Sequence, residues 1–111
     1  MENNLNQYIE AIRAKTEVGE IKWQKQSPVV FVALITSGGN KAQIILQRVA
    51  SRAGADYVLR VIDEITKLEV VNVSGSTKPQ LAPILRQLFA AADNNVDAFG
   101  AQFLKNLLGP Q

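Results

Sequence analysis

Apolar positions recur along this chain with two spacings, which predict helices at both ends and strands between them. Leu5, Tyr8, Ile9 and Ile12 repeat every three or four residues, so residues 3–16 are predicted to form an amphipathic helix. Shorter segments rich in β-branched residues, separated by glycine-containing or charged turns, are typical of strands. The predicted strands span residues 20–25, 29–36, 41–50, 57–62 and 67–73.

The helical spacing returns near the C-terminus. Apolar residues from Leu81 to Ala92 mark one helix, with Pro79 and Pro83 tolerated near its start. Asn94-Asn95 is expected to break that helix, and Asn95 to cap a last helix that continues to Leu108. A Gly-Pro pair then ends the helix.

This order of elements defines the predicted fold class as α+β, with an N-terminal helix, a five-stranded antiparallel β-meander and two C-terminal helices. The turns between strands are too short for crossovers, so neighbouring strands must run antiparallel. The 111 residues suffice for a single α+β domain over 1–111, large enough to bury a core without disulfides or metals.

The predicted strands are apolar on both faces. In residues 29–36, for example, Val30, Val32 and Leu34 alternate with Phe31 and Ile35. An antiparallel sheet covered on one side should instead alternate apolar and polar residues. Either the helices divide between the two faces, or the second face meets another molecule. We therefore expect a homodimer in which a sheet face supplies much of the contact.

One short motif stands out between the first helix and the sheet. Thr16-Glu17-Val18-Gly19-Glu20-Ile21-Lys22-Trp23 has the form T-x-x-G-x-I-x-W. Gly19 permits a left-handed turn out of the helix, and Trp23 is expected to be a buried anchor. A helix that runs into this motif, then a meander and helices, resembles a group of short uncharacterised bacterial α+β proteins. The resemblance implies the same layout and no known activity or functional residue.

The amino-acid composition limits the kinds of catalytic and metal-binding site that this chain can form. The chain has no His and no Cys, and its acidic residues form no cluster. Zinc sites, disulfides and most acid–base or nucleophilic arrangements are therefore excluded, and we predict no catalytic, metal or cofactor site. The remaining Ser, Thr, Tyr, Lys and carboxylate side chains leave enzymatic activity open, but no pattern indicates it.

Two polar segments invite a functional interpretation. Gly75-Ser76-Thr77-Lys78 lies between a strand and a helix, a position that suits anion binding. It lacks the spacing of a phosphate-binding loop, and Pro79 removes a donor, so capping of the helix by Ser76 or Thr77 is preferred. Asp63-Glu64 is interpreted as the polar tip of a hairpin.

Positive charge gathers weakly in the middle of the chain. Lys41, Arg48, Arg52 and Arg60 lie on neighbouring predicted strands, opposed only by Asp56 within residues 28–60. They form a possible basic surface, but nucleic-acid sites usually carry more charge with interleaved aromatic residues. Nucleic acid is therefore not the expected partner.

The functional prediction is a non-catalytic binding or interaction protein that self-associates, with an unknown protein partner left open. The N-terminus lacks the basic and apolar regions of a signal peptide, and no apolar run could span a membrane, so a cytoplasmic location is expected. Two alternatives stay open: a nucleic-acid-associated protein that uses the basic middle strands, and a small-ligand carrier with a pocket between sheet and helices.

Overall fold

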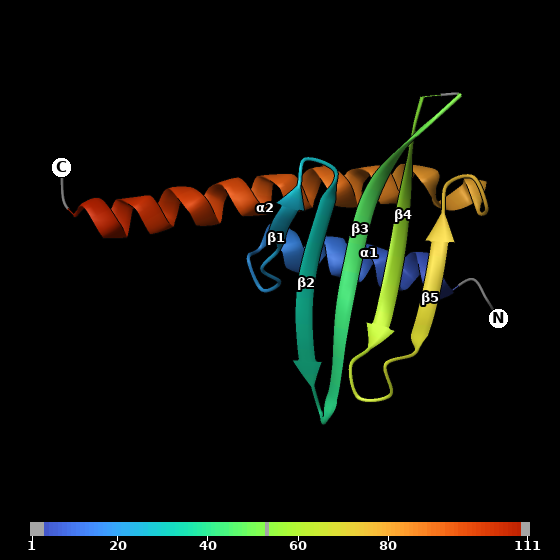
Figure 1. Cartoon of the computed structure of the whole chain (residues 1–111), viewed down its shortest axis with the longest axis horizontal. Coiled ribbons are helices and arrows are strands. Elements are labelled where there is room, and N and C mark those ends of the chain that lie inside the picture. The colour runs from blue at the N-terminus through green and yellow to red at the C-terminus, as the bar shows by residue number, and fades with distance from the viewer. Residues whose placement is uncertain (1–3, 53, 110–111) are drawn as a thin grey trace.

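The chain folds into two layers, a five-stranded sheet and a pair of helices that both lie on the same face of it (Figure 1). The computed structural model describes residues 4–52 and 54–109. The fold class is α+β with an antiparallel sheet, as the sequence predicts. Its elements are α1 (Asn4–Glu17), β1 (Gln24–Ser27), β2 (Val30–Ser37), β3 (Asn40–Ser51), β4 (Gly54–Asp63), β5 (Glu69–Ser74), the 3-10 turn η1 (Pro79–Leu81) and α2 (Ala82–Leu108).

The sheet is a meander in which the strands keep their chain order, β1-β2-β3-β4-β5. A row of directly paired residues crosses four of the strands: Phe31 with Leu46, Leu46 with Leu59, and Leu59 with Val73. All four are buried, which places this row on the face that the helices cover. Because side chains alternate along a strand, the register of the whole sheet follows from this row.

The core lies between this sheet face and the two helices. From α2 it receives Leu85 and Leu88, which are fully buried, and from α1 it receives Ile9. Phe89 of α2 packs edge-on against Phe31, with ring centroids 5.0 Å apart, and against Tyr57 at 5.2 Å. Large apolar side chains in close contact of this kind dominate the stability of a small domain.

The C-terminal region differs from the sequence prediction. Instead of two helices separated at Asn94-Asn95, the short turn η1 runs into one α-helix of 27 residues. Asn95 therefore does not cap a helix, because it lies in the interior of α2. Its weak helical preference is overridden by tertiary hydrogen bonds of its side chain.

The first predicted strand is also displaced. Residues 20–23 are not in a strand, and β1 covers only Gln24–Ser27. Ile21 and Trp23, expected on one face of a strand, instead direct backbone groups toward α2. These groups are therefore not engaged in pairing with β2.

Candidate protein-interaction surface

The segment between α1 and β1 fixes the position of α2. Trp23 is only 2% exposed, and its indole Nε1–H donates a 2.9 Å hydrogen bond to Thr16 Oγ1. Thr16 is itself buried and donates to the carbonyl of Ile12, one turn back in α1. Gly19, with a φ of +82°, makes the left-handed turn between them. The T-x-x-G-x-I-x-W motif is thus a turn in which the Trp23 side chain is hydrogen-bonded back to the end of α1.

Asn95 connects this turn to α2. Its Oδ1 accepts a 3.0 Å hydrogen bond from the backbone N–H of Trp23, and its Nδ2 donates to the carbonyls of Thr16 and Ile21, at 3.0 and 2.9 Å. One side chain thereby ties the middle of α2 to residues more than 70 positions earlier in the sequence. Sequence reasoning missed this role, because an asparagine pair in a helical pattern usually indicates a break.

Toward its C-terminus α2 leaves the body of the protein. Figure 1 shows the C-terminal part of α2 running past β1, the edge strand, with no other element beside it. We call residues 98–108 the α2 arm. Eleven helical residues measure about 16 Å in length. The arm contributes to the elongated shape, whose principal extents are 51 × 38 × 22 Å.

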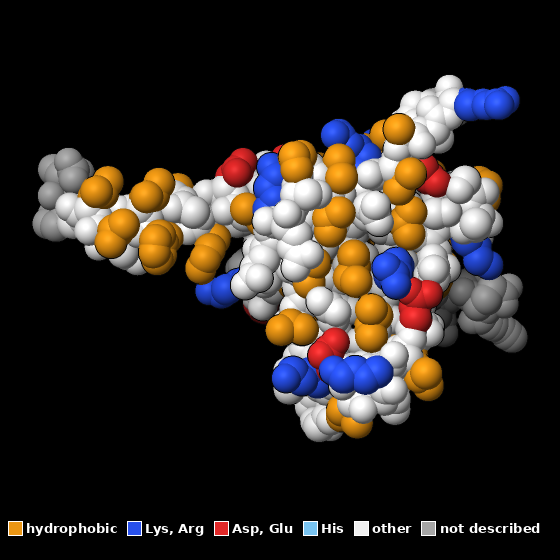
Figure 2. Space-filling view, in the orientation of Figure 1, with side chains coloured by type: hydrophobic (Ala, Val, Ile, Leu, Met, Phe, Trp, Pro, Cys, Tyr) orange, Lys and Arg blue, Asp and Glu red, His pale blue; other side chains and the backbone are white. Residues whose placement is uncertain are grey.

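The arm carries an apolar stripe. Its five large side chains recur at helical spacing and are between 53% and 67% exposed: Phe99, Phe103, Leu104, Leu107 and Leu108. The same stripe begins inside the protein, where Leu85, Leu88 and Ala92 are buried in the core. In Figure 2 hydrophobic side chains cover the side of the arm that faces the viewer, which is also the side on which the sheet lies. The arm therefore extends the core-facing side of α2, and its large apolar side chains remain more than half exposed among the described residues.

Among the described residues, the positively charged side chain of Lys22 contacts the base of the arm. The ammonium group of Lys22 is 5.4 Å from the centre of the Phe99 ring, within the range of a cation–π interaction. Lys22 is exposed and belongs to the segment that leads into β1. The start of the stripe is therefore adjacent to the free edge of the sheet.

The outer sheet face, turned away from the helices, is the second exposed surface (Figure 2). Leu34 on this face is 61% exposed. Polar and apolar residues share this face: Val32 pairs with Ile45, Ile45 with Arg60, and Arg60 with Asn72. The two helices do not divide between the faces, so no described helix covers this face, which is less uniformly apolar than the arm.

The four basic residues considered for nucleic-acid binding are distributed over different parts of the sheet. Lys41 and Arg52 lie near opposite ends of the β3–β4 hairpin. Arg48 points to the helix side, where its guanidinium is 5.9 Å from the Phe89 ring. Arg60 is paired with Glu69 at 2.5 Å on the outer face. The structure thus does not bring the four together as one continuous patch.

In the Gly75–Lys78 segment, considered above for anion binding, Ser76 binds a carboxylate of the protein itself, that of Asp56. Asp56 accepts hydrogen bonds from the Ser76 hydroxyl at 2.7 Å, from the Ser76 backbone N–H at 3.3 Å and from the Tyr57 backbone N–H at 2.9 Å. A side chain at Gly75 would meet Asp56 Oδ1 at 2.7 Å, which explains the glycine. The predicted cap is absent, because no side chain caps η1 or α2 and Thr77 bonds to Ser74 instead.

These donors lower the pKa of Asp56, with the Ser76 hydroxyl as the largest cause and burial opposing it. A lowered folded-state pKa stabilises the fold above the unfolded value of about 3.9, and this stabilisation is lost as the pH falls below it. We expect Asp56→Asn to cost about 1 kcal/mol at pH 7 and progressively less below pH 4. Urea unfolding at both pH values measures this. Ser76→Ala should behave alike, and an equal cost at both pH values for the two variants would contradict the explanation.

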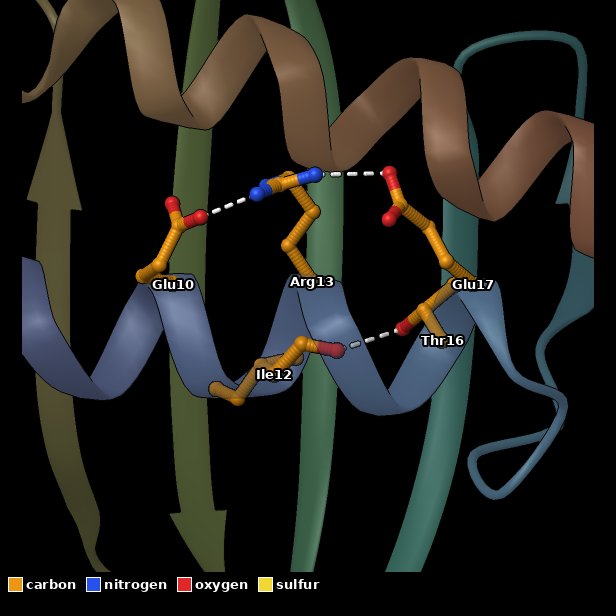
Figure 3. A network of polar contacts seen from close by, with 5 residues as sticks. All are labelled: Glu10, Ile12, Arg13, Thr16 and Glu17. Carbon is orange, nitrogen blue, oxygen red and sulfur yellow. Dashed lines mark hydrogen bonds and ion pairs between the residues drawn. The ribbon is translucent and has the colours of Figure 1, made fainter.

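A surface groove lies between the two helices. It measures about 640 Å³, and its walls include Arg13 and Val18 from the α1 side and Ala91 and Ala98 from α2. Figure 3 shows the polar network at its edge, where Arg13 pairs with Glu10 and, at 2.7 Å, with Glu17. The Arg13 hydrogen bond lowers the pKa of Glu10. These exposed pairs contribute little stability. The space between sheet and helices, where a carrier would hold its ligand, is filled by core side chains.

The described part of the chain offers few other functional elements. Residues 4–52 and 54–109 contain no group of three or more acidic residues placed to hold a metal ion. Within those same ranges, no helix combines the length and apolar character needed to cross a membrane. Exposed apolar surface is therefore the main candidate feature among the described residues.

Comparison of the chain with protein-family models, with curated proteins and with solved structures found no match in any of the three.

Proposed function

We propose that this protein is a non-catalytic interaction protein that self-associates, and that the α2 arm supplies the principal contact. The observation that carries the proposal is the apolar stripe: five large side chains on three helical turns, each more than half exposed, on a helix that projects from the fold. Leaving such a surface in water forfeits about 25 cal/mol for each Å² of apolar area. Contiguous apolar patches of this kind mark contact sites in soluble proteins.

The arm is favoured over the outer sheet face, which the sequence alone suggested as the contact. Arg60, Glu69 and Asn72 form a hydrogen-bonded polar group on that face, and burying it would require new partners for each. The stripe contains no polar side chain. Its burial therefore carries a smaller desolvation cost.

Light scattering after size exclusion tests the proposal. We expect the native chain at micromolar concentration to show a mass of about 24 kDa, twice the 12.1 kDa of one chain. Phe103→Asp should weaken the dimer at least about 100-fold, because symmetry buries the new charge twice. The variant should keep its helical circular dichroism, since Phe103 is 58% exposed in the single chain.

Leu34→Asp is the matched control, because Leu34 is 61% exposed on the outer sheet face. It should leave the dimer intact. A monomer of 12.1 kDa for the native chain would refute self-association. Dissociation by Leu34→Asp but not by Phe103→Asp would move the contact to the sheet.

A further inference from the structure

The direction of the stripe restricts what can cover it. Val96 still packs against the core cluster beneath the sheet, and Phe99, less than one turn later, lies beneath Lys22 at the sheet edge. Phe103 and Leu107 continue the same line at intervals of four residues. The stripe therefore lies on the side of α2 that faces the sheet. Because the arm runs past β1, the stripe points into the space where a further strand of the sheet would lie (Figures 1 and 2).

The edge strand itself is poorly suited to pairing with another strand. β1 has only four residues, Gln24–Ser27, and Pro28 follows it. It also carries Lys25, whose ammonium group is 3.9 Å from the carboxylate of Asp93. Short, charged edges flanked by proline discourage the addition of strands. A helix is therefore a better occupant of the adjoining space than a strand that would extend the sheet.

We propose that the stripe is covered by the α2 arm of a second copy of this chain, with the two arms antiparallel and face to face. Phe103 of each copy then lies near the two-fold axis, and Leu107 of one copy lies opposite Phe99 of the other. This arrangement rests on the proposed self-association and gives it a geometry. Each arm then fills the space beside the other copy's edge strand β1, in line with that copy's sheet.

Charge favours the antiparallel direction. The C-terminal end of a helix carries partial negative charge, and cations near it are stabilising. An antiparallel pair brings this end of each arm toward Lys22 of the other copy. A parallel pair would instead place both sheets at the same end, and would bring Asp97 close to its counterpart and Lys105 close to its own.

The surface area that a stable dimer interface requires also favours antiparallel arms. A covered aromatic side chain buries about 150–250 Å², so Phe99 and Phe103, each just over half exposed, offer about 100 Å² apiece. Five stripe residues of similar exposure give about 500 Å², below the roughly 800 Å² per partner of a standard interface. Contact between the end of each arm and the other copy's β1 edge supplies additional area, and only the antiparallel arrangement makes that contact on both sides.

Cysteine cross-linking tests the geometry, because the chain has no native cysteine. Single variants Leu104→Cys and Asp97→Cys of the full chain are treated with a short bifunctional maleimide. About the proposed axis the two thiols of a Leu104→Cys dimer are offset by about 3 Å along the helices, whereas those of an Asp97→Cys dimer are about 18 Å apart. Leu104→Cys should therefore cross-link to a dimer band at least about tenfold faster than Asp97→Cys.

Each other outcome has a distinct meaning. Equal and rapid cross-linking of both variants would indicate parallel arms and overturn the inference, while self-association stands. Cross-linking of neither variant, with Leu34→Cys cross-linking instead, would place the contact on the sheet. A native chain that is monomeric by light scattering would refute self-association itself. Light scattering on both cysteine variants before treatment confirms that the substitutions preserve the dimer.

Discussion

Trp23→Ala should reduce the free energy of unfolding by about 3–5 kcal/mol, the range seen when a large buried aromatic residue is truncated. Trp23 is 2% exposed at the junction of α1, α2 and the sheet. The substitution leaves a cavity there and removes the indole donor from Thr16 Oγ1. A domain of this size has only about 5–15 kcal/mol of stability in total, so a loss of this size threatens folding at physiological temperature.

Urea denaturation followed by circular dichroism measures the Trp23 effect. Trp23→Phe is the graded comparison, because it keeps much of the ring volume and loses the indole N–H; we expect about 1–2 kcal/mol. Val18→Ala, in the same turn but 70% exposed, should change stability by less than about 0.5 kcal/mol. A cost below about 1 kcal/mol for Trp23→Ala would show that Trp23 does not anchor the fold.

Asn95→Ala should cost about 2–4 kcal/mol, although alanine is the better helix former. The variant loses three hydrogen bonds and leaves the Trp23 backbone N–H and the Ile21 carbonyl without this partner. Each buried polar group left unsatisfied costs about 1–3 kcal/mol, which exceeds a gain of about 0.5 kcal/mol in helix propensity.

Asn94→Ala provides the matched control for Asn95. The two residues are adjacent on α2, but Asn94 is exposed, and the described hydrogen bonds of its neighbour do not involve it. We expect Asn94→Ala to be neutral or slightly stabilising, by about 0.5 kcal/mol. If both alanine variants stabilise the protein equally in the same urea titration, Asn95 is no more than a surface residue of the helix.

Trp23 and Asn95, the residues changed in these variants, also position the α2 arm. Asn95 and Trp23 hold the middle of α2 against the body, and the arm begins three residues later. Loosening this junction should therefore weaken self-association together with stability. Phe103→Asp, in contrast, should affect self-association alone, which separates the two roles.

Local spacing of residues was enough to predict much of this fold. Periodicity alone predicts an amphipathic helix over residues 3–16, observed as Asn4–Glu17, and places four of the five strands within a few residues of their observed bounds. Short turns force the antiparallel meander, and the order of strands follows without further information. These features depend on neighbours in the sequence, so the sequence contains the necessary signals.

Features that depend on distant partners were predicted less well. The sequence indicated a break at Asn94-Asn95 and a strand over residues 20–25, and both errors have one cause: the side chain of Asn95 binds the backbone of Ile21 and Trp23, more than 70 positions away. Likewise, Ser76 was a predicted cap, but Asp56 from β4 engages it. Local propensity cannot anticipate a hydrogen-bond partner supplied by another element.

The α2 arm likewise combines a feature that the local sequence fixes with one that depends on the tertiary structure. The sequence by itself determined that Val96, Phe99, Phe103 and Leu107 share one helical face, because their spacing fixes it. Only the tertiary structure decided which of them are covered. Because α2 is continuous and its C-terminal part runs past β1 (Figure 1), Val96 packs on the core while Phe99, Phe103 and Leu107 are more than half exposed to solvent.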